Sequence, residues 1–91
     1  MSLLRGPPGR LKVTVLLFAS YRELVGAESL TVSLPRSTTV GTLLAELRRR
    51  GGGWARLPTA PAVAVNRSYS RDATELADGD EVALIPPVAG G

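Results

Sequence analysis

The stretch TVGTLLAELRRRG, from Thr39 to Gly51, is the clearest element of the sequence and decides the class of fold. Its apolar residues recur at i, i+3, i+4 and i+7, the period of a helix with one buried stripe. Thr39 is a candidate N-cap, and Gly51 is a candidate residue for the turn that ends the helix. We expect the buried stripe to consist of Val40, Leu43, Leu44 and Leu47.

Strand patterns flank this helix on both sides. LKVTVLLFA (11–19) and SLTVSL (29–34) precede it, and AVAVN (62–66) and EVALIP (81–86) follow it. The first and last of these are apolar on both faces, so we expect them side by side in the middle of a sheet. The order strand, strand, helix, strand, strand, with one further short strand left open after residue 66, predicts an α+β fold. One main helix then covers one face of a mixed sheet.

Three connections carry further predictions. Ser20 is a candidate cap for a helical turn that ends at Gly26. Trp54 follows three glycines and is interpreted as a lid on the edge of the core, with a binding role as the alternative. Asp78-Gly79-Asp80 is a strong turn signal. Both aspartates are interpreted as turn formers, although contacts to a basic partner surface stay open.

The charge balance is mild. The chain has 91 residues and a formal net charge of +3, from 11 basic and 8 acidic residues. Arg48, Arg49 and Arg50 form the only basic run, at the expected end of the helix, where cations complement the helix dipole. Glu46 and Arg50 stand at i, i+4, which predicts a weak surface pair. We therefore expect no nucleic-acid partner.

The chain has no Cys and no His. This removes thiol nucleophiles, thiolate metal sites and the commonest general base, and we expect no metal site. Residues 1–10 lack periodicity and are interpreted as a flexible N-terminal arm rather than a signal peptide. No apolar run approaches the length of a membrane span, so we expect a cytoplasmic protein without a membrane partner.

The C-terminal end, Pro86 to Gly91, is the candidate functional segment. The two prolines favour an extended path, and six extended residues reach roughly 20 Å. Gly90 and Gly91 have no side chains, as a narrow channel closing around the backbone would require. The terminal carboxylate is a poor electrophile until it is activated, for example as an acyl-adenylate. A reactive tail and an idle, frayed end are both compatible with this pattern.

The ending LADGDEVALIPPVAGG (76–91) resembles the C-terminus of the MoaD type of ubiquitin-like sulfur carriers, which are small subunits of molybdopterin synthase. LLFASYRELVG (16–26) and AVAVN (62–66) are similar to the same family. The resemblance implies a β-grasp domain over residues 11–85 and an extended reactive tail over residues 86–91. The arm and the triple glycine 51–53 depart from the family pattern.

The resemblance also implies a chemistry. Gly91 is adenylated with ATP by an E1-like activating enzyme of the MoeB type and converted to a thiocarboxylate, a C-terminal 1-thioglycine. The tail then enters the large subunit of the synthase (MoaE-type), where it donates sulfur to a cyclic pyranopterin phosphate precursor. Gly90 gives access, and no cofactor is bound by the chain itself. The chain is then not an enzyme alone. The partner-binding residues that the resemblance implies are Pro86, Pro87, Val88 and Ala89.

Other functions remain open from the sequence. Carriers of the same fold serve tRNA thiolation, thiamin or cysteine synthesis, and ubiquitin-like modifiers are conjugated to lysines. A plain interaction module with an idle tail is a third class. A docking tail needs an apolar patch beside it. Phe18, Leu84 and Val88 are candidates, with core burial as the competing interpretation for Phe18 and Leu84.

Overall fold

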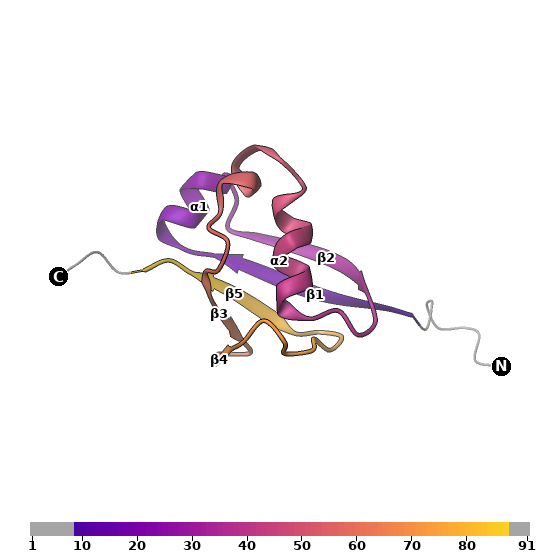
Figure 1. The fold of residues 1–91 in the computed structure, drawn as a ribbon. Helices are drawn as coiled ribbons and strands as arrows, with labels where there is room; N and C mark the ends of the chain where they lie inside the picture. Colours follow the sequence, from indigo (N-terminus) through magenta and orange to yellow (C-terminus); the bar gives the residue numbers. More distant parts are fainter. Residues whose placement is uncertain (1–8, 88–91) are drawn as a thin grey trace.

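The computed structural model describes residues 9–87 (Figure 1). The predictions for the arm residues 1–8 and for Val88, Ala89, Gly90 and Gly91 lie outside the described residues. None of the helices within residues 9–87 is long and apolar enough to cross a membrane.

A five-stranded mixed sheet forms the base of the molecule within the described residues. Its strand order is β2-β1-β5-β3-β4. β1 pairs antiparallel with β2 and parallel with β5, so the first and last strands lie side by side in the middle, as predicted. The strands are β1 (Arg10–Leu17), β2 (Ser29–Pro35), β3 (Ala62–Val65), β4 (Ser68–Ser70) and β5 (Glu81–Ile85).

The helices lie on one face of this sheet (Figure 1). α2 (Val40–Arg48) crosses the sheet. α1 (Ala19–Val25) and a 3-10 turn, η2 (Gly52–Arg56), lie on the side of the upper end of α2 in Figure 1. The other face carries no helix within residues 9–87. A main helix held against a mixed sheet with a parallel central pair is the β-grasp arrangement, so the predicted α+β fold is confirmed.

The core lies between α2 and the sheet. Alternate residues of β1 and β5 point into it, as a period of two requires, and the predicted helical stripe of α2 closes it from above. Burying each such side chain contributes about 1.5–3 kcal/mol. The side chains with at most 1% exposure include Val13, Val15, Val40, Leu43, Leu47, Val82 and Leu84. Leu84 is therefore a core residue, which removes it from the docking candidates.

The ends of α2 follow the sequence in part. The Thr39 hydroxyl accepts a hydrogen bond from the Thr42 backbone N–H at 3.2 Å, which confirms the predicted N-cap. The predicted Glu46–Arg50 pair is wrong: Glu46 pairs with Arg49 at 3.4 Å. Arg50 instead lies over the Trp54 ring, 5.9 Å from its centroid. Trp54 is partly buried against the core, consistent with the predicted lid.

Three local predictions need correction. β1 begins at Arg10, which was assigned to the arm but pairs with Pro35. Ser20 does not cap α1: the helix begins at Ala19 directly after β1, and Phe18 is its N-cap with no side-chain hydrogen bond. Phe18 is still extended and α1 begins at the next residue, so Ser20 already lies inside the helix. Gly26 ends α1 with φ +84°, as predicted.

Candidate functional site

The chain leaves the sheet through its central strand. β5 lies between β1 and β3 and ends at Ile85, and Pro86 and Pro87 follow (Figure 1). Proline has no backbone N–H, so the sheet ladder stops here. Pro86 is half-buried and Pro87 is exposed. Pro86 and Pro87 therefore follow directly on a strand that is paired on both sides.

Pro86 and Pro87 line a shallow hollow of about 430 Å³, which we call the proline hollow. Its walls are mainly apolar and include Pro58, Pro61 and the ring of Tyr21. Burial raises the pKa of the Tyr21 phenol, which is therefore uncharged at neutral pH. The surface beside the tail thus offers rings and apolar side chains rather than charge.

The uncovered face of the sheet carries a continuous apolar row. The strand register places Leu16 of β1 beside Ala83 of β5, Ala83 beside Ala64 of β3, and Ala64 beside Tyr69 of β4. The two alanines in the middle are small and the residues at both ends are large. The sheet face is therefore concave between Leu16 and Tyr69.

This concave surface is a hollow of about 370 Å³, which we call the open-face hollow. Phe18 and Ile85 form its wall on the side of the tail, and Arg67 and Glu81 supply its polar rim. Phe18 is 46% exposed and Tyr69 is 76% exposed. Large exposed rings around an apolar hollow are typical of a protein-binding surface. Tyr69 and Ile85 line both hollows, so the two surfaces are continuous.

A hydrogen-bonded turn fixes the start of β5. Asp78 Oδ1 accepts from the Lys12 N–H at 2.7 Å, and Asp80 Oδ2 accepts from the Ala77 N–H at 2.7 Å. Asp80 Oδ1 also accepts from Asn66 Nδ2 at 2.9 Å, and Asn66 Oδ1 accepts from the Glu81 N–H at 3.0 Å. Asp78 thus accepts from a backbone donor, and Asp80 accepts from one backbone and one side-chain donor, which favours their interpretation as turn formers.

The described part of the chain contains no candidate metal site. Within residues 9–87, no three Asp, Glu, His or Cys side chains come together as a metal site would require. The described residues supply a central strand, two prolines directly after it and an apolar surface beside them.

A match to a family model shows to which protein family the chain belongs. The model of the ThiS family matches residues 15–91. The chain belongs to the ThiS family. The resemblance drawn from the C-terminal motif is thereby confirmed.

Two relatives of this ThiS-family chain carry the same description, "Molybdopterin synthase sulfur carrier subunit". The protein of Aedes aegypti is 40% identical over 89 residues, which cover 89% of this chain and 90% of the relative. The protein of Escherichia coli (strain K12) is 38% identical over 81 residues, covering 87% and 99%.

Solved structures give the same picture of the fold. Subunits 1 and 2 of the molybdopterin-converting factor from Helicobacter pylori 26695 form a protein–protein complex. The matching chain has a TM-score of 0.65 and 27% identity, covering 89% of this chain and 100% of that one. Small archaeal modifier protein 1 of H. volcanii has a TM-score of 0.67 and 29% identity, covering 86% and 99%. A ubiquitin of Caldiarchaeum subterraneum, 20% identical with a TM-score of 0.64, supports the ubiquitin-like fold alone.

The predicted site residues divide into two groups. Phe18, Pro86 and Pro87 lie at the same end of this ThiS-family domain, around the two continuous hollows. Val88, Ala89, Gly90 and Gly91 lie outside the described residues. Sequence reasoning did not name the apolar residues of the open-face hollow other than Phe18, which are Leu16, Ala64, Tyr69, Ala83 and Ile85. The apolar second face of the first and last strands was the signal for most of them, but it was used only to place those strands centrally.

Proposed function

We propose that the chain is the sulfur-carrier subunit of a molybdopterin synthase and that Gly91 carries the sulfur as a C-terminal thiocarboxylate. The observation that supports this most is the exit of Pro86 and Pro87 from the central strand beside an apolar, exposed sheet face. Relatives described as molybdopterin synthase sulfur carrier subunits share 35–40% identity with the chain. Delivery of a C-terminus into a partner requires these same features.

The chemistry follows from the terminal carboxylate. At neutral pH this group is ionised and unreactive toward nucleophiles. An activating partner of the MoeB type joins it to the AMP part of ATP and releases pyrophosphate. A sulfur nucleophile then displaces AMP and leaves the thiocarboxylate. The sulfur of this anion bonds to a carbon of the cyclic pyranopterin phosphate precursor and displaces an oxygen group there. Water then cleaves the acyl–sulfur bond, which leaves the sulfur on the pterin and restores the carboxylate, and a second loaded chain supplies the other sulfur of the dithiolene. Gly90 keeps the path free of side chains, and the residues that bind the pterin belong to the partner.

The partner surface is proposed to be the two hollows together. The Helicobacter pylori complex joins two subunits of a molybdopterin-converting factor, which supports a large-subunit partner (MoaE-type) for this chain as well. Phe18, Tyr69 and Ile85 are the apolar anchors on this side of the contact. A few buried anchors dominate most protein interfaces, and rings are prominent among them.

The decisive experiment is a single-turnover assay. The chain with a C-terminal thiocarboxylate is mixed with a purified large subunit and the pterin precursor, and the dithiolene product is measured. The same chain with an ordinary carboxylate is the control. Product from the thiocarboxylate form alone is expected. No product from that form, with a large subunit that works with its own carrier, would remove the proposal. Sulfur transfer to tRNA, thiamin or cysteine precursors instead would assign the chain to another carrier pathway.

A protein modifier is the second candidate, because the chain is also similar to small archaeal modifier protein 1. This function predicts covalent adducts of the chain with other proteins in its native cells. Adducts that disappear when Gly91 is deleted would favour it, and their absence under conditions that load Gly91 with sulfur would favour the carrier function.

A further inference from the structure

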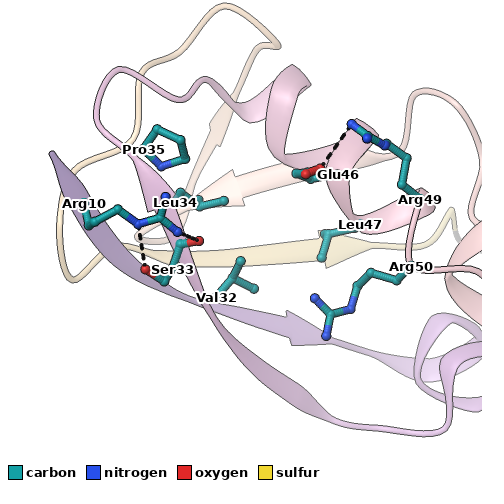
Figure 2. A pocket seen from close by; sticks show the side chains of 9 residues that line it. All are labelled: Arg10, Val32, Ser33, Leu34, Pro35, Glu46, Leu47, Arg49 and Arg50. Carbon is teal, nitrogen blue, oxygen red and sulfur yellow. Dashed lines mark hydrogen bonds and ion pairs between the residues drawn. The ribbon is translucent and has the colours of Figure 1, made fainter.

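A groove on the far side of the domain takes no part in the proposed sulfur transfer. It lies between the outer edge of β2 and the last turn of α2 and has a volume of about 520 Å³ (Figure 2). Val32, Leu34 and Leu47 form its floor, and arginines stand around it. None of its lining residues lines either hollow beside the tail. We call it the β2–α2 groove.

The outer edge of β2 presents unpaired backbone groups. Among the described residues, no strand pairs with this side of β2. The Leu17 N–H donates to the Glu28 carbonyl at 2.9 Å, and the Arg36 N–H donates to the Gly9 carbonyl at 2.8 Å. These two bonds fix which residues of β2 direct their backbone N–H and C=O groups toward β1, because hydrogen-bonded and non-hydrogen-bonded pairs alternate along an antiparallel ladder. In β2 these are the even-numbered residues.

The odd-numbered residues, Ser29, Thr31 and Ser33, consequently direct their backbone N–H groups away from the sheet. Arg10 supports this assignment, since its guanidinium reaches around the edge and donates to the Ser33 carbonyl at 3.0 Å and to the Ser33 hydroxyl at 3.2 Å (Figure 2). An outer row of N–H and C=O groups is a template for an added strand. β2 is seven residues long, whereas the opposite edge strand, β4, has three.

Positively charged side chains surround the outer edge of β2. Arg10, Arg49 and Arg50 line the groove, and Glu46 is its one acidic lining residue. Glu46 pairs with Arg49, whose side chain is 78% exposed, so this ion pair is weak. Within residues 9–87, no carboxylate pairs with Arg10 or Arg50, whose contacts are Ser33 and the Trp54 ring. The groove therefore has an apolar floor, an open strand edge and a cationic rim.

We propose that the β2–α2 groove binds an extended acidic peptide segment of a partner protein, which adds to β2 as a further strand. The peptide backbone pairs with Thr31 and with the N–H of Ser33. Its apolar side chains pack over Val32, which is only partly buried, and its carboxylates meet Arg49 and Arg50. Main-chain hydrogen bonds supply affinity in such complexes, and pockets for alternate side chains supply selectivity.

A peptide fits these features better than a nucleic acid does. A nucleic acid would use the cations but leave the strand edge and the apolar floor without partners. Three arginines offset by one glutamate are also few compared with the basic faces that bind nucleic acids. The groove lies beside Arg10 at the start of β1, and the tail leaves from the end of the parallel strand β5. A partner in the groove can thus bind while the tail is engaged elsewhere.

The test uses the full chain and a fluorescein-labelled peptide with three central valines flanked by two glutamates on each side. Binding is measured by fluorescence anisotropy at low and high salt. The doubly substituted variant Arg49→Glu/Arg50→Glu is expected to bind the peptide at least tenfold more weakly. Arg56→Glu/Arg71→Glu is the matched control, with the same charge change on exposed residues outside the groove, and should bind within twofold of the parent. A peptide with lysines in place of the glutamates should not bind.

Amide hydrogen exchange gives a second measurement that does not depend on the variants. Peptide binding is expected to slow exchange at Thr31 and Ser33, and to leave the β4 edge at Tyr69 unchanged. Protection of β4 instead of β2 would overturn the proposal. So would equal binding of the basic peptide, or tighter binding of a single-stranded DNA of the same charge. Deleting Gly90 and Gly91 should leave the peptide affinity unchanged, which keeps this test separate from that of the sulfur-carrier function.

Discussion

Gly53 of η2 lies where the backbone of η2 approaches the backbone at the end of α1. A Cβ atom placed on it would collide with the carbonyl oxygen of Leu24, at the end of α1. This is a contact with backbone, which cannot rotate away as a side chain does. The triple glycine 51–53, which looked like an addition to the family pattern, thus has a packing role at its third position. It lets η2 lie against α1 at the end of the domain from which the tail leaves.

We therefore expect Gly53→Ala to lower the free energy of unfolding by about 1–3 kcal/mol, as overpacking does in other cores. Urea unfolding followed by circular dichroism measures it. Gly9→Ala is the control, because a Cβ at Gly9 meets nothing within 4 Å. Equal stability of the two variants would contradict the close approach.

Asp80 tests the interpretation of the acidic turn at the same scale. Asp80→Ala removes the acceptors for the Ala77 N–H and for Asn66 Nδ2, and should destabilise the protein by about 1–2 kcal/mol. Sulfur transfer assayed well below the melting temperature should stay unchanged. Asp72→Ala removes the same charge from an exposed side chain and should change stability by less than about 0.5 kcal/mol. Lost transfer in a stable Asp80→Ala protein would favour the alternative role, contact with a partner.

At the scale of elements, the periodic segments were predictable, whereas the connections were predictable only in part. The stripe of α2 and the inward faces of β1 and β5 follow from periods of 3.6 and 2, because burial imposes those periods. β4 was not assigned, since three residues with an exposed Tyr69 carry no period. Ser20 failed as a cap because the path of the chain after β1, not side-chain chemistry, begins α1. Arg50 contacts the Trp54 ring instead of Glu46, and this contact depends on where η2 lies.

The open-face hollow illustrates the same limit. Phe18 was a candidate because a docking tail needs an apolar patch beside it, and Pro86 and Pro87 were candidates because of the C-terminal motif. Ala64 and Ala83 were not, because small residues make a hollow only once the strand register sets them between Leu16 and Tyr69. A hollow is a property of four strands together, and no single segment encodes it.

The open sheet face yields a prediction at this scale. Phe18→Ala should weaken binding to the large synthase subunit about tenfold, since an exposed ring at an interface is a typical anchor. It should leave the stability of the isolated chain nearly unchanged, because the ring is 46% exposed. Isothermal titration calorimetry measures the affinity. Lys12→Ala alters an exposed side chain at the other end of β1 and should bind within twofold of the parent. Unchanged binding by Phe18→Ala would move the interface elsewhere.

At the scale of the whole molecule, the two proposed interaction surfaces share no lining residue: the β2–α2 groove follows the outer edge of β2, and the two hollows lie around β5, β3 and β4. β1 and β5 are parallel, so Arg10 at the β2–α2 groove is far along the sheet from Pro86 at the tail exit. The central parallel pair thus separates Arg10, at one side of the groove proposed for a second partner, from Pro86, where the proposed reactive tail leaves the sheet. A carrier that visits an activating enzyme and then a synthase subunit gains from such a separation, because a segment held in the groove does not block the tail.

The last prediction concerns the separation between the domain, which carries the fold, and the tail, which carries the proposed chemistry. Deleting Gly90 and Gly91 should abolish sulfur transfer and shift the free energy of unfolding by less than about 0.5 kcal/mol. The reason is that the sheet and the core are built from residues 10–85, while the proposed chemistry needs only the terminal carboxylate. Thermal unfolding and the single-turnover assay measure the two effects on one preparation. A large loss of stability would mean that the glycines hold the fold, and retained transfer would mean that the reactive group lies elsewhere in the chain.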